Sequence, residues 1–263
     1  MTSTSLAPLA VALPLALSAC GSTGSALVTF HAAAAGPADA VAGQPLVLPS
    51  NAYGYQVAIT RARLHVGALY LNRSVPISGS QAQPCILPGV YDGQVTASLD
   101  LDALSPAPQP FPALGEGTAE EALTGQVWLF GTDVTATADP TVLVDVGGTA
   151  SRGGTSYPFT GRLTVSTNRQ APVTNPALPG ASPLCKLRIV TPIRVDFTLA
   201  QGGTLLLRVD PRSWFQNIDF AQVPPDPVDP STRRFVDSAQ AQPDLWSQGV
   251  IGTNAYGFTW QAP

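Results

Sequence analysis

Short runs of β-branched, aromatic and aliphatic residues recur along most of this 263-residue chain, and turn residues interrupt nearly all of them. Such runs are typical of β-strands, whose side chains alternate between the two faces of a sheet. The chain also holds 24 Gly and 26 Pro residues, which suit the tight turns that join strands. The runs occupy residues 27–32, 55–60, 62–71, 94–101, 125–131, 142–149, 157–166, 187–198, 203–210 and 249–260. Many short strands with tight turns predict an all-β fold, an antiparallel β-sandwich of the Greek-key or jelly-roll kind.

Helical patterns are confined to two short segments, residues 116–123 and 211–220, and the second opens with a Pro that suits a first helical turn. Proline has no backbone N–H for a sheet ladder, so we expect Pro-rich stretches to form surface loops or to block sheet edges. These stretches are residues 105–112, 172–183 and 224–230. None has the composition of an interdomain linker, and residues 27–263 are therefore expected to form one domain.

Residues 6–19 form an apolar run of small and aliphatic residues that leads directly into Cys20. The run is shorter than the 20 or so residues that span a bilayer, but it fits the apolar core of an export signal. Its end, Leu17-Ser18-Ala19-Cys20, resembles the signal of bacterial lipoproteins, in which a Leu and two small residues precede an invariant Cys. Residues 1–5 depart from that pattern, because they carry no Lys or Arg.

The resemblance implies that a signal peptide, residues 1–19, is removed and that Cys20 carries acyl chains on its thiol and its new amino group. Residues 20–26 would then be the lipidated Cys and a flexible tether to the domain. Gly21 stands where inner-membrane retention signals place Asp, which favours the outer membrane, on its periplasmic face or at the cell surface. The expected location is the cell envelope, and the first expected partner is the membrane itself.

Two further cysteines, Cys85 and Cys185, lie in Pro/Gly-containing segments. An even pair in an exported protein predicts a disulfide, with two buried thiols or a metal pair as alternatives. In the chain-entropy description, closing a loop of about 100 residues contributes roughly 4–5 kcal/mol of stability.

The charge of the chain excludes one class of partner. Its formal net charge is −4, with one Lys and scattered Arg residues, so no basic surface is available to neutralise nucleic-acid phosphates. An envelope protein or a polysaccharide is the expected partner beside the membrane.

Catalytic patterns are weak in this sequence. No G-x-S-x-G motif is present, and the two histidines, His31 and His65, both lie within strand-like runs, where packed or edge positions are the usual role. We therefore expect no enzymatic activity, with a hydrolase as the least favoured class. A binding or structural role is the expected function.

A metal-binding lipoprotein is the alternative function, with calcium or copper as the ion. Calcium prefers oxygen ligands, and two loosely acidic loops qualify, Asp133 with Asp139 and Asp226 with Asp229. The segments around His31 and His65 resemble periplasmic copper-binding proteins that use histidines. The chain has no Met after residue 1, so a soft copper site would be poor, and the expected number of cofactors is none.

Aromatic residues suggest where a sugar or a partner protein would bind. Trp128 and Phe130 lie in an apolar run and are expected in the core, whereas Trp246, Tyr256 and Trp260 lie in a polar, Gly-containing segment. The latter three are the predicted binding surface.

Overall fold

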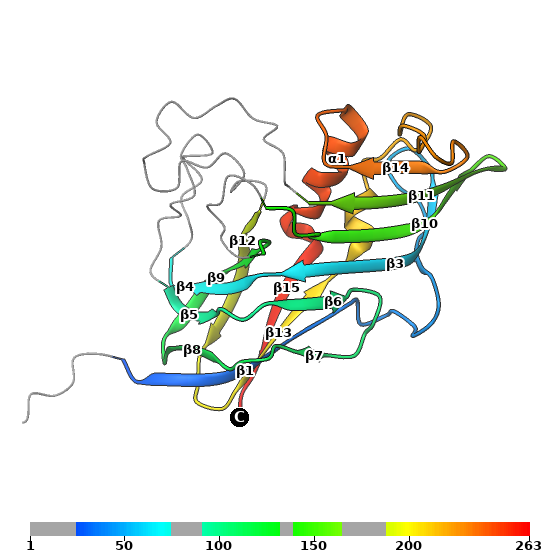
Figure 1. Cartoon of the computed structure of the whole chain (residues 1–263). Helices are drawn as coiled ribbons and strands as arrows, with labels where there is room; N and C mark the ends of the chain where they lie inside the picture. Colours follow the sequence, from blue (N-terminus) through cyan, green and yellow to red (C-terminus); the bar gives the residue numbers. More distant parts are fainter. Residues whose placement is uncertain (1–24, 75–90, 132–138, 165–187) are drawn as a thin grey trace, which may run out of the picture.

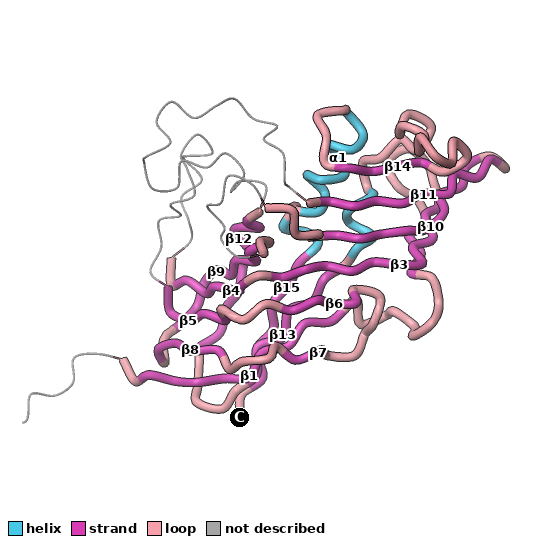
Figure 2. Tube along the Cα trace, in the orientation of Figure 1, coloured by secondary structure: helices cyan, strands magenta, loops and turns pink. Residues whose placement is uncertain are grey.

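The computed structural model describes residues 25–74, 91–131, 139–164 and 188–263, and most of its regular structure is β-strand (Figures 1 and 2). The all-β prediction is confirmed. The strands are β1 (Leu27–Ala35), β2 (Leu46–Leu48), β3 (Gln56–Val66), β4 (Ala68–Asn72), β5 (Tyr91–Val95), β6 (Leu99–Asp102), β7 (Gln109–Pro110), β8 (Gly115–Thr118), β9 (Glu121–Trp128), β10 (Val144–Arg152), β11 (Thr155–Leu163), β12 (Ile189–Thr198), β13 (Thr204–Val209), β14 (Arg233–Val236) and β15 (Tyr256–Gln261). The helical elements are the 3-10 helices η2 (Pro211–Phe215) and η3 (Thr253–Ala255) and the α-helix α1 (Ala241–Val250).

The larger sheet has nine strands in the order β12–β9–β4–β5–β8–β1–β13–β15, with β7 paired to β1. Its two outermost strands, β12 and β15, contact each other. Phe197 of β12 stacks on Trp260 of β15, with ring centroids 5.7 Å apart. The sheet therefore curves until it nearly closes on itself.

The smaller sheet has six strands in the order β14–β11–β10–β3–β2, with β6 paired to β3. Most neighbouring strands of both sheets are antiparallel, as predicted, but β1–β13 and β11–β14 are parallel pairs. Both sheets are therefore mixed. The parallel partners are far apart in sequence, and tight turns between successive strands, the signal used for the prediction, carry no information about such pairs.

The chain passes from the smaller sheet to the larger one at Gly67, between β3 and β4. The Gly67 amide donates a hydrogen bond to the Trp128 carbonyl oxygen at 2.8 Å. A Cβ atom at this position would lie 2.5 Å from the Phe130 carbonyl oxygen, so the close approach requires glycine. This crossing sets β4 beside β9 in the larger sheet.

Buried apolar side chains from both sheets form one continuous core. Beneath the smaller sheet, Phe159 packs against Phe215 of η2 at 4.9 Å, and Phe235 packs against Trp246 of α1 at 5.3 Å. The helical segments thus cover the inner face of this sheet rather than its solvent face. None of the helices in the described ranges is long and apolar enough to cross a membrane.

Of the two segments predicted to be helical, only one contains a helix in the structure. Residues 116–123 are not helical, because they contribute to β8 and β9. Residues 211–220 contain η2, where the Asp210 side chain accepts a hydrogen bond from the Arg212 amide and Pro211 opens the helix. Three strands (β2, β7 and β14) and most of α1 lie outside the segments predicted for strands or helices.

Candidate functional site

Four aromatic side chains lie next to one another on the larger sheet, and we call them the aromatic cluster: Tyr91, Tyr70, Trp128 and Phe130. The ring centroids of Tyr91 and Tyr70 are 5.0 Å apart, those of Tyr70 and Trp128 4.5 Å, and those of Trp128 and Phe130 6.2 Å. Tyr91 is 41% exposed, and the other three are half-buried. The cluster crosses β5, β4 and the end of β9.

Strand alternation explains why these rings face away from the core. Leu69 and Leu71 of β4 and Val127 of β9 are buried in the core. Successive side chains of a strand point to opposite faces, so Tyr70 and Trp128 lie on the outer face. Trp128 and Phe130 were expected in the core, and their half-exposed positions correct that prediction.

The strand register extends this face into a row of side chains that crosses five strands. Thr29 of β1 pairs with Glu116 of β8, Glu116 with Gln94 of β5, Gln94 with Tyr70 of β4, and Tyr70 with Gln126 of β9. Residues paired across neighbouring strands share a face. At about 4.8 Å per strand, this cross-strand row is about 19 Å long. It ends at Gln126, which is fully buried and whose Oε1 accepts the Trp128 indole N–H at 2.8 Å.

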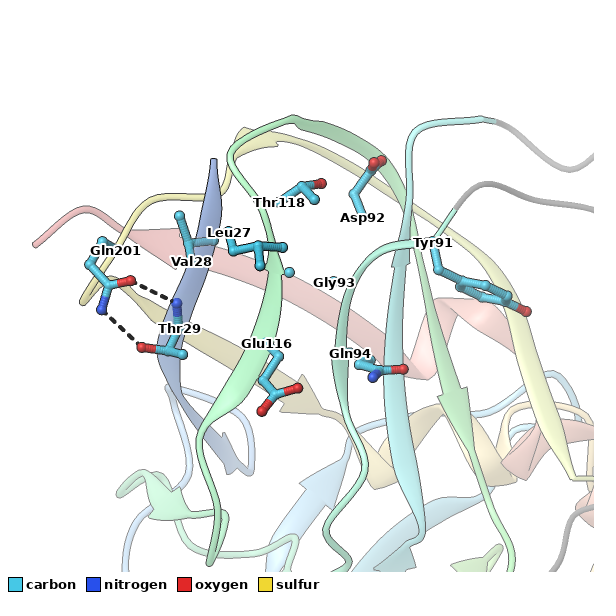
Figure 3. A pocket seen from close by; sticks show the side chains of 11 residues that line it. Leu27, Val28, Thr29, Tyr91, Asp92, Gly93, Gln94, Glu116, Thr118 and Gln201 are labelled. Atoms are coloured by element: carbon cyan, nitrogen blue, oxygen red, sulfur yellow. Dashed lines mark hydrogen bonds between the residues drawn. The ribbon is translucent and has the colours of Figure 1, made fainter. Parts of the chain in front are cut away.

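A groove of about 510 Å³ lies over the β5, β8 and β1 part of the row. Its lining includes Leu27, Tyr91, Gln94, Glu116 and Gln201, which Figure 3 shows around one hollow. We call it the β5–β8–β1 groove. It shares Tyr91 with the aromatic cluster, so the two features form one continuous candidate site.

One wall of the groove is held in place by side-chain hydrogen bonds. Gln201, from the turn before β13, accepts the Thr29 backbone N–H at 2.9 Å and donates its amide to the Thr29 hydroxyl at 2.9 Å (Figure 3). This pair fixes the start of β1 against the neighbouring turn. The groove therefore has a rigid edge on the side where the chain enters β1.

The opposite wall contains a buried carboxylate whose charge is balanced by an arginine. Asp92 is 2% exposed, and its Oδ1 accepts hydrogen bonds from Arg73 at 2.7 and 3.1 Å. The hydrogen bonds and charge of Asp92 raise the pKa of Arg73 above its usual value. Glu120 is a weaker partner of Arg73, at 3.8 Å.

Gln94 and Glu116 offer the free polar groups of the groove. Both are exposed, and neither side chain makes a hydrogen bond or an ion pair with the described residues. A Gln amide can donate and accept at once, and a carboxylate accepts only. Burial raises the pKa of both Tyr70 and Tyr91, and the nearby Tyr70 raises that of Tyr91 further, so both phenols are neutral at physiological pH.

Gly93 and Gly117 line the groove, and the glycines of β5 and β8 let these strands approach closely. A Cβ at Gly117 would lie 2.3 Å from the Asp92 carbonyl oxygen, and one at Gly115 would lie 2.2 Å from the Phe30 ring. On the inner side of β5, a Cβ at Gly93 would lie 2.7 Å from Leu199. Larger side chains would push the two strands apart or displace the core beneath them.

The aromatic residues that the sequence predicted as a binding surface lie elsewhere. Trp246 is fully buried and Tyr256 is 7% exposed, so neither can form a surface platform. Trp260 is half-buried between Phe197 and Phe30. The inner side of α1 packs on the core and includes the polar Gln242 and Ser247 beside Trp246.

The predicted calcium ligands have structural roles where the structure describes them. Asp139 accepts hydrogen bonds from the backbone N–H groups of Gly131 and Thr141. Burial alone would raise its pKa, but these hydrogen bonds and the charge of Arg188 lower it. Asp133 lies outside the described residues.

The second acidic loop caps its own turns. Asp226 accepts the backbone N–H groups of Val228 and Asp229, and Asp229 accepts hydrogen bonds from Ser231 and Thr232. Within the ranges that the structure describes, no three His, Cys, Asp or Glu side chains gather as a metal site would require. His31 is exposed on β1.

His65 takes part in a pair of the kind that a hydrolase would use. Its Nδ1 lies 2.7 Å from Asp100 Oδ1, a carboxylate–imidazole pair across β3 and β6. The other ring nitrogen, Nε2, is buried and has no hydrogen-bond partner in the described part of the chain. His65 lies outside the lining of the β5–β8–β1 groove.

The predicted lipidation and disulfide sites fall outside the structure's described ranges. Cys20, Cys85 and Cys185 are all in this position. Their roles therefore stay predictions.

Sequence reasoning missed Tyr70, Tyr91 and Gln94 as site residues. A signal for Tyr70 was present in the segment 68–72, where two leucines alternate with it. The same alternation separates Trp128 from Val127. What the sequence lacks is the strand order that brings β1, β8, β5, β4 and β9 side by side.

Comparisons with known proteins give no match: no family model, no curated protein and no solved structure is significantly similar to this chain.

Proposed function

We propose that this protein is a glycan-binding lipoprotein of the bacterial envelope, held to the membrane through Cys20 and without catalytic activity of its own. The observation that carries the glycan proposal is the cross-strand row together with the groove over it. The row presents Tyr70, Gln94 and Glu116 in line on one sheet face, with Tyr91 beside them.

The chemistry of this face suits a sugar better than an apolar ligand. A pyranose ring has an apolar C–H face, which packs on an aromatic ring, and hydroxyl groups around its edge, which need donors and acceptors. Tyr91 and Tyr70 supply the aromatic surface, and Gln94 and Glu116 supply the polar groups. The accessible part of the row, from Thr29 to Tyr70, spans three strand spacings, about 14 Å, and allows several sugar units of one linear chain to be contacted together.

The shape of the site also favours an extended ligand. The groove is continuous with the aromatic cluster through Tyr91 and runs across the strands rather than into the core. A small metabolite is usually enclosed on most sides, whereas a polymer needs a site that is open at its ends. A linear polysaccharide fits this requirement.

Retention of the protein on insoluble polysaccharides tests the proposal. The full chain, in detergent micelles, is applied to chitin, to cellulose and to purified peptidoglycan sacculi. We expect retention on at least one of them, and a loss of affinity of about tenfold, or about 1.4 kcal/mol, for Tyr91→Ala, because the exposed ring supplies stacking surface.

Tyr53→Ala is the matched control. Tyr53 is 43% exposed, close to the 41% of Tyr91, but it lies in the turn before β3 and outside the groove. We expect this variant to bind as the parent does. Failure of the parent to bind any of the three polymers, or equal losses in the two variants, would refute the proposal.

A further inference from the structure

Glu116 carries a negative charge that the described structure leaves uncompensated. It is exposed at the centre of the β5–β8–β1 groove, between Thr29 and Gln94 in the cross-strand row. The other carboxylate of the groove, Asp92, is compensated by Arg73 at 2.7 Å. Among the described residues no cation lies within ion-pair distance of Glu116, so the groove has one net negative charge at a defined position.

The aromatic rings near Glu116 also favour a positively charged ligand. The face of a tyrosine ring is the negative end of its quadrupole and attracts cations. Tyr70 pairs with Gln94, the residue next to Glu116 in the row, and the ring of Tyr91 lies 5.0 Å from that of Tyr70. A ligand that extends from the groove onto the aromatic cluster therefore meets a carboxylate and two electron-rich rings within a few strand spacings.

We infer that the groove selects glycans that contain free amino sugars, with a protonated amine of the ligand placed at Glu116. The inference builds on the proposed glycan-binding function and names its ligand class. An ammonium group forms an ion pair with the carboxylate, whereas an N-acetyl group at the same place brings no charge, and a uronic acid brings repulsion. The cross-strand row favours a sugar over a basic peptide, because Gln94 and the rings match hydroxyl groups and pyranose faces as well as the charge.

A pair of matched oligosaccharides tests the inference. Isothermal titration calorimetry compares a β-1,4-linked tetramer of glucosamine with the tetramer of N-acetylglucosamine on the full chain in detergent micelles. We expect about fivefold tighter binding of the free-amine tetramer, the upper range for an exposed ion pair. Raising the salt concentration to 1 M should remove this preference, since the charges are then screened beyond about 3 Å.

Glu116→Gln keeps the shape of the side chain and removes its charge. In this variant we expect the preference for the free-amine tetramer to fall to about onefold, because the charge that distinguishes the two tetramers is gone. Glu121→Gln is the control, because Glu121 is an exposed glutamate at the start of β9 and outside the groove. It should keep the fivefold preference.

The outcomes separate the two proposals. If the parent binds both tetramers equally, the amino-sugar inference is wrong and the glycan-binding function stands. If the parent binds neither tetramer and no polysaccharide, both are wrong. Tighter binding of an oligolysine peptide than of the glucosamine tetramer would also overturn the inference. The groove would then recognise positive charge alone and have no preference for a sugar.

Discussion

At the scale of single residues, Asn51 connects the turn before β3 to η2. It is 6% exposed, and its Oδ1 accepts the backbone N–H groups of Tyr53 and Tyr55 at 2.9 and 3.0 Å. Its Nδ2 donates to the carbonyl oxygens of Phe215 and Ile218 at 3.0 and 2.7 Å. All the hydrogen-bonding capacity of one amide is thus used between two segments more than 160 residues apart in sequence.

We expect Asn51→Ala to lower the free energy of unfolding by about 3 kcal/mol, because buried backbone groups on both segments lose their partners. Guanidinium unfolding followed by tryptophan fluorescence measures the change. Asn254→Ala is the control: Asn254 stands in the same local sequence, Asn-Ala-Tyr-Gly, but it is exposed. Its effect should stay within about 0.5 kcal/mol. Similar losses in the two variants would contradict this role of Asn51.

At the scale of elements, β8 shows how glycines bring two strands together beneath the groove. Gly117→Ala adds a Cβ that would lie 2.3 Å from the Asp92 carbonyl oxygen of β5, and this clash is with backbone, which cannot rotate away as a side chain can. We expect a loss of about 1–3 kcal/mol in unfolding free energy, the usual cost of overpacking. Polysaccharide affinity should also fall, because the β5–β8 pair carries Gln94 and Glu116.

Gly257→Ala in β15 is the control for this prediction. A Cβ at Gly257 meets no atom within 4 Å, so the same substitution should be nearly neutral. Thermal unfolding of both variants, with polysaccharide retention measured in parallel, gives the comparison. A Gly117→Ala protein as stable as the parent would show that β5 and β8 separate without cost.

The elements also show how far the sequence predicts this fold. Runs such as 157–166 and 203–210 combine apolar alternation with flanking turns, and strands β11 and β13 form there. The helix expected at 116–123 became β8 and β9, because the glycines that discourage a helix there allow the close β5–β8 contact instead. Helix α1 escaped prediction since its sequence, AQPDLWSQGV, contains Pro and Gly and only weak amphipathic periodicity.

The candidate site was less predictable than the strands that build it. Local alternation indicates that Tyr70 and Trp128 face away from the leucines and valines beside them. The cross-strand row, however, requires the pairings β1–β8, β8–β5 and β4–β9, none of which joins strands adjacent in sequence. Such long-range pairings arise from packing of the whole sheet, and no local pattern encodes them.

At the scale of the whole molecule, the position of the groove bears on the proposed lipid anchor. Leu27, the first residue of β1, lines the groove and is 85% exposed. Residues 21–26 separate it from Cys20, a stretch that reaches roughly 20 Å when extended at about 3.4 Å per residue. An acylated Cys20 would therefore hold the groove close to the bilayer surface, where it meets glycans that lie against the same membrane.

We expect Cys20→Ser to release the protein from the membrane without altering the groove. Several acyl chains contribute about 0.8 kcal/mol per buried CH₂, so their loss should move the protein, once the apolar signal segment has been removed, from the membrane pellet to the soluble fraction. Metabolic labelling with palmitate should mark the parent and leave the variant unlabelled.

The released variant should bind the same polysaccharide in solution with unchanged affinity, because Tyr91, Gln94 and Glu116 lie on strands whose pairing does not involve Cys20. A variant that still sediments with membranes would show that something other than acylation holds the protein there, and the proposed proximity of the groove to the bilayer would lose its basis.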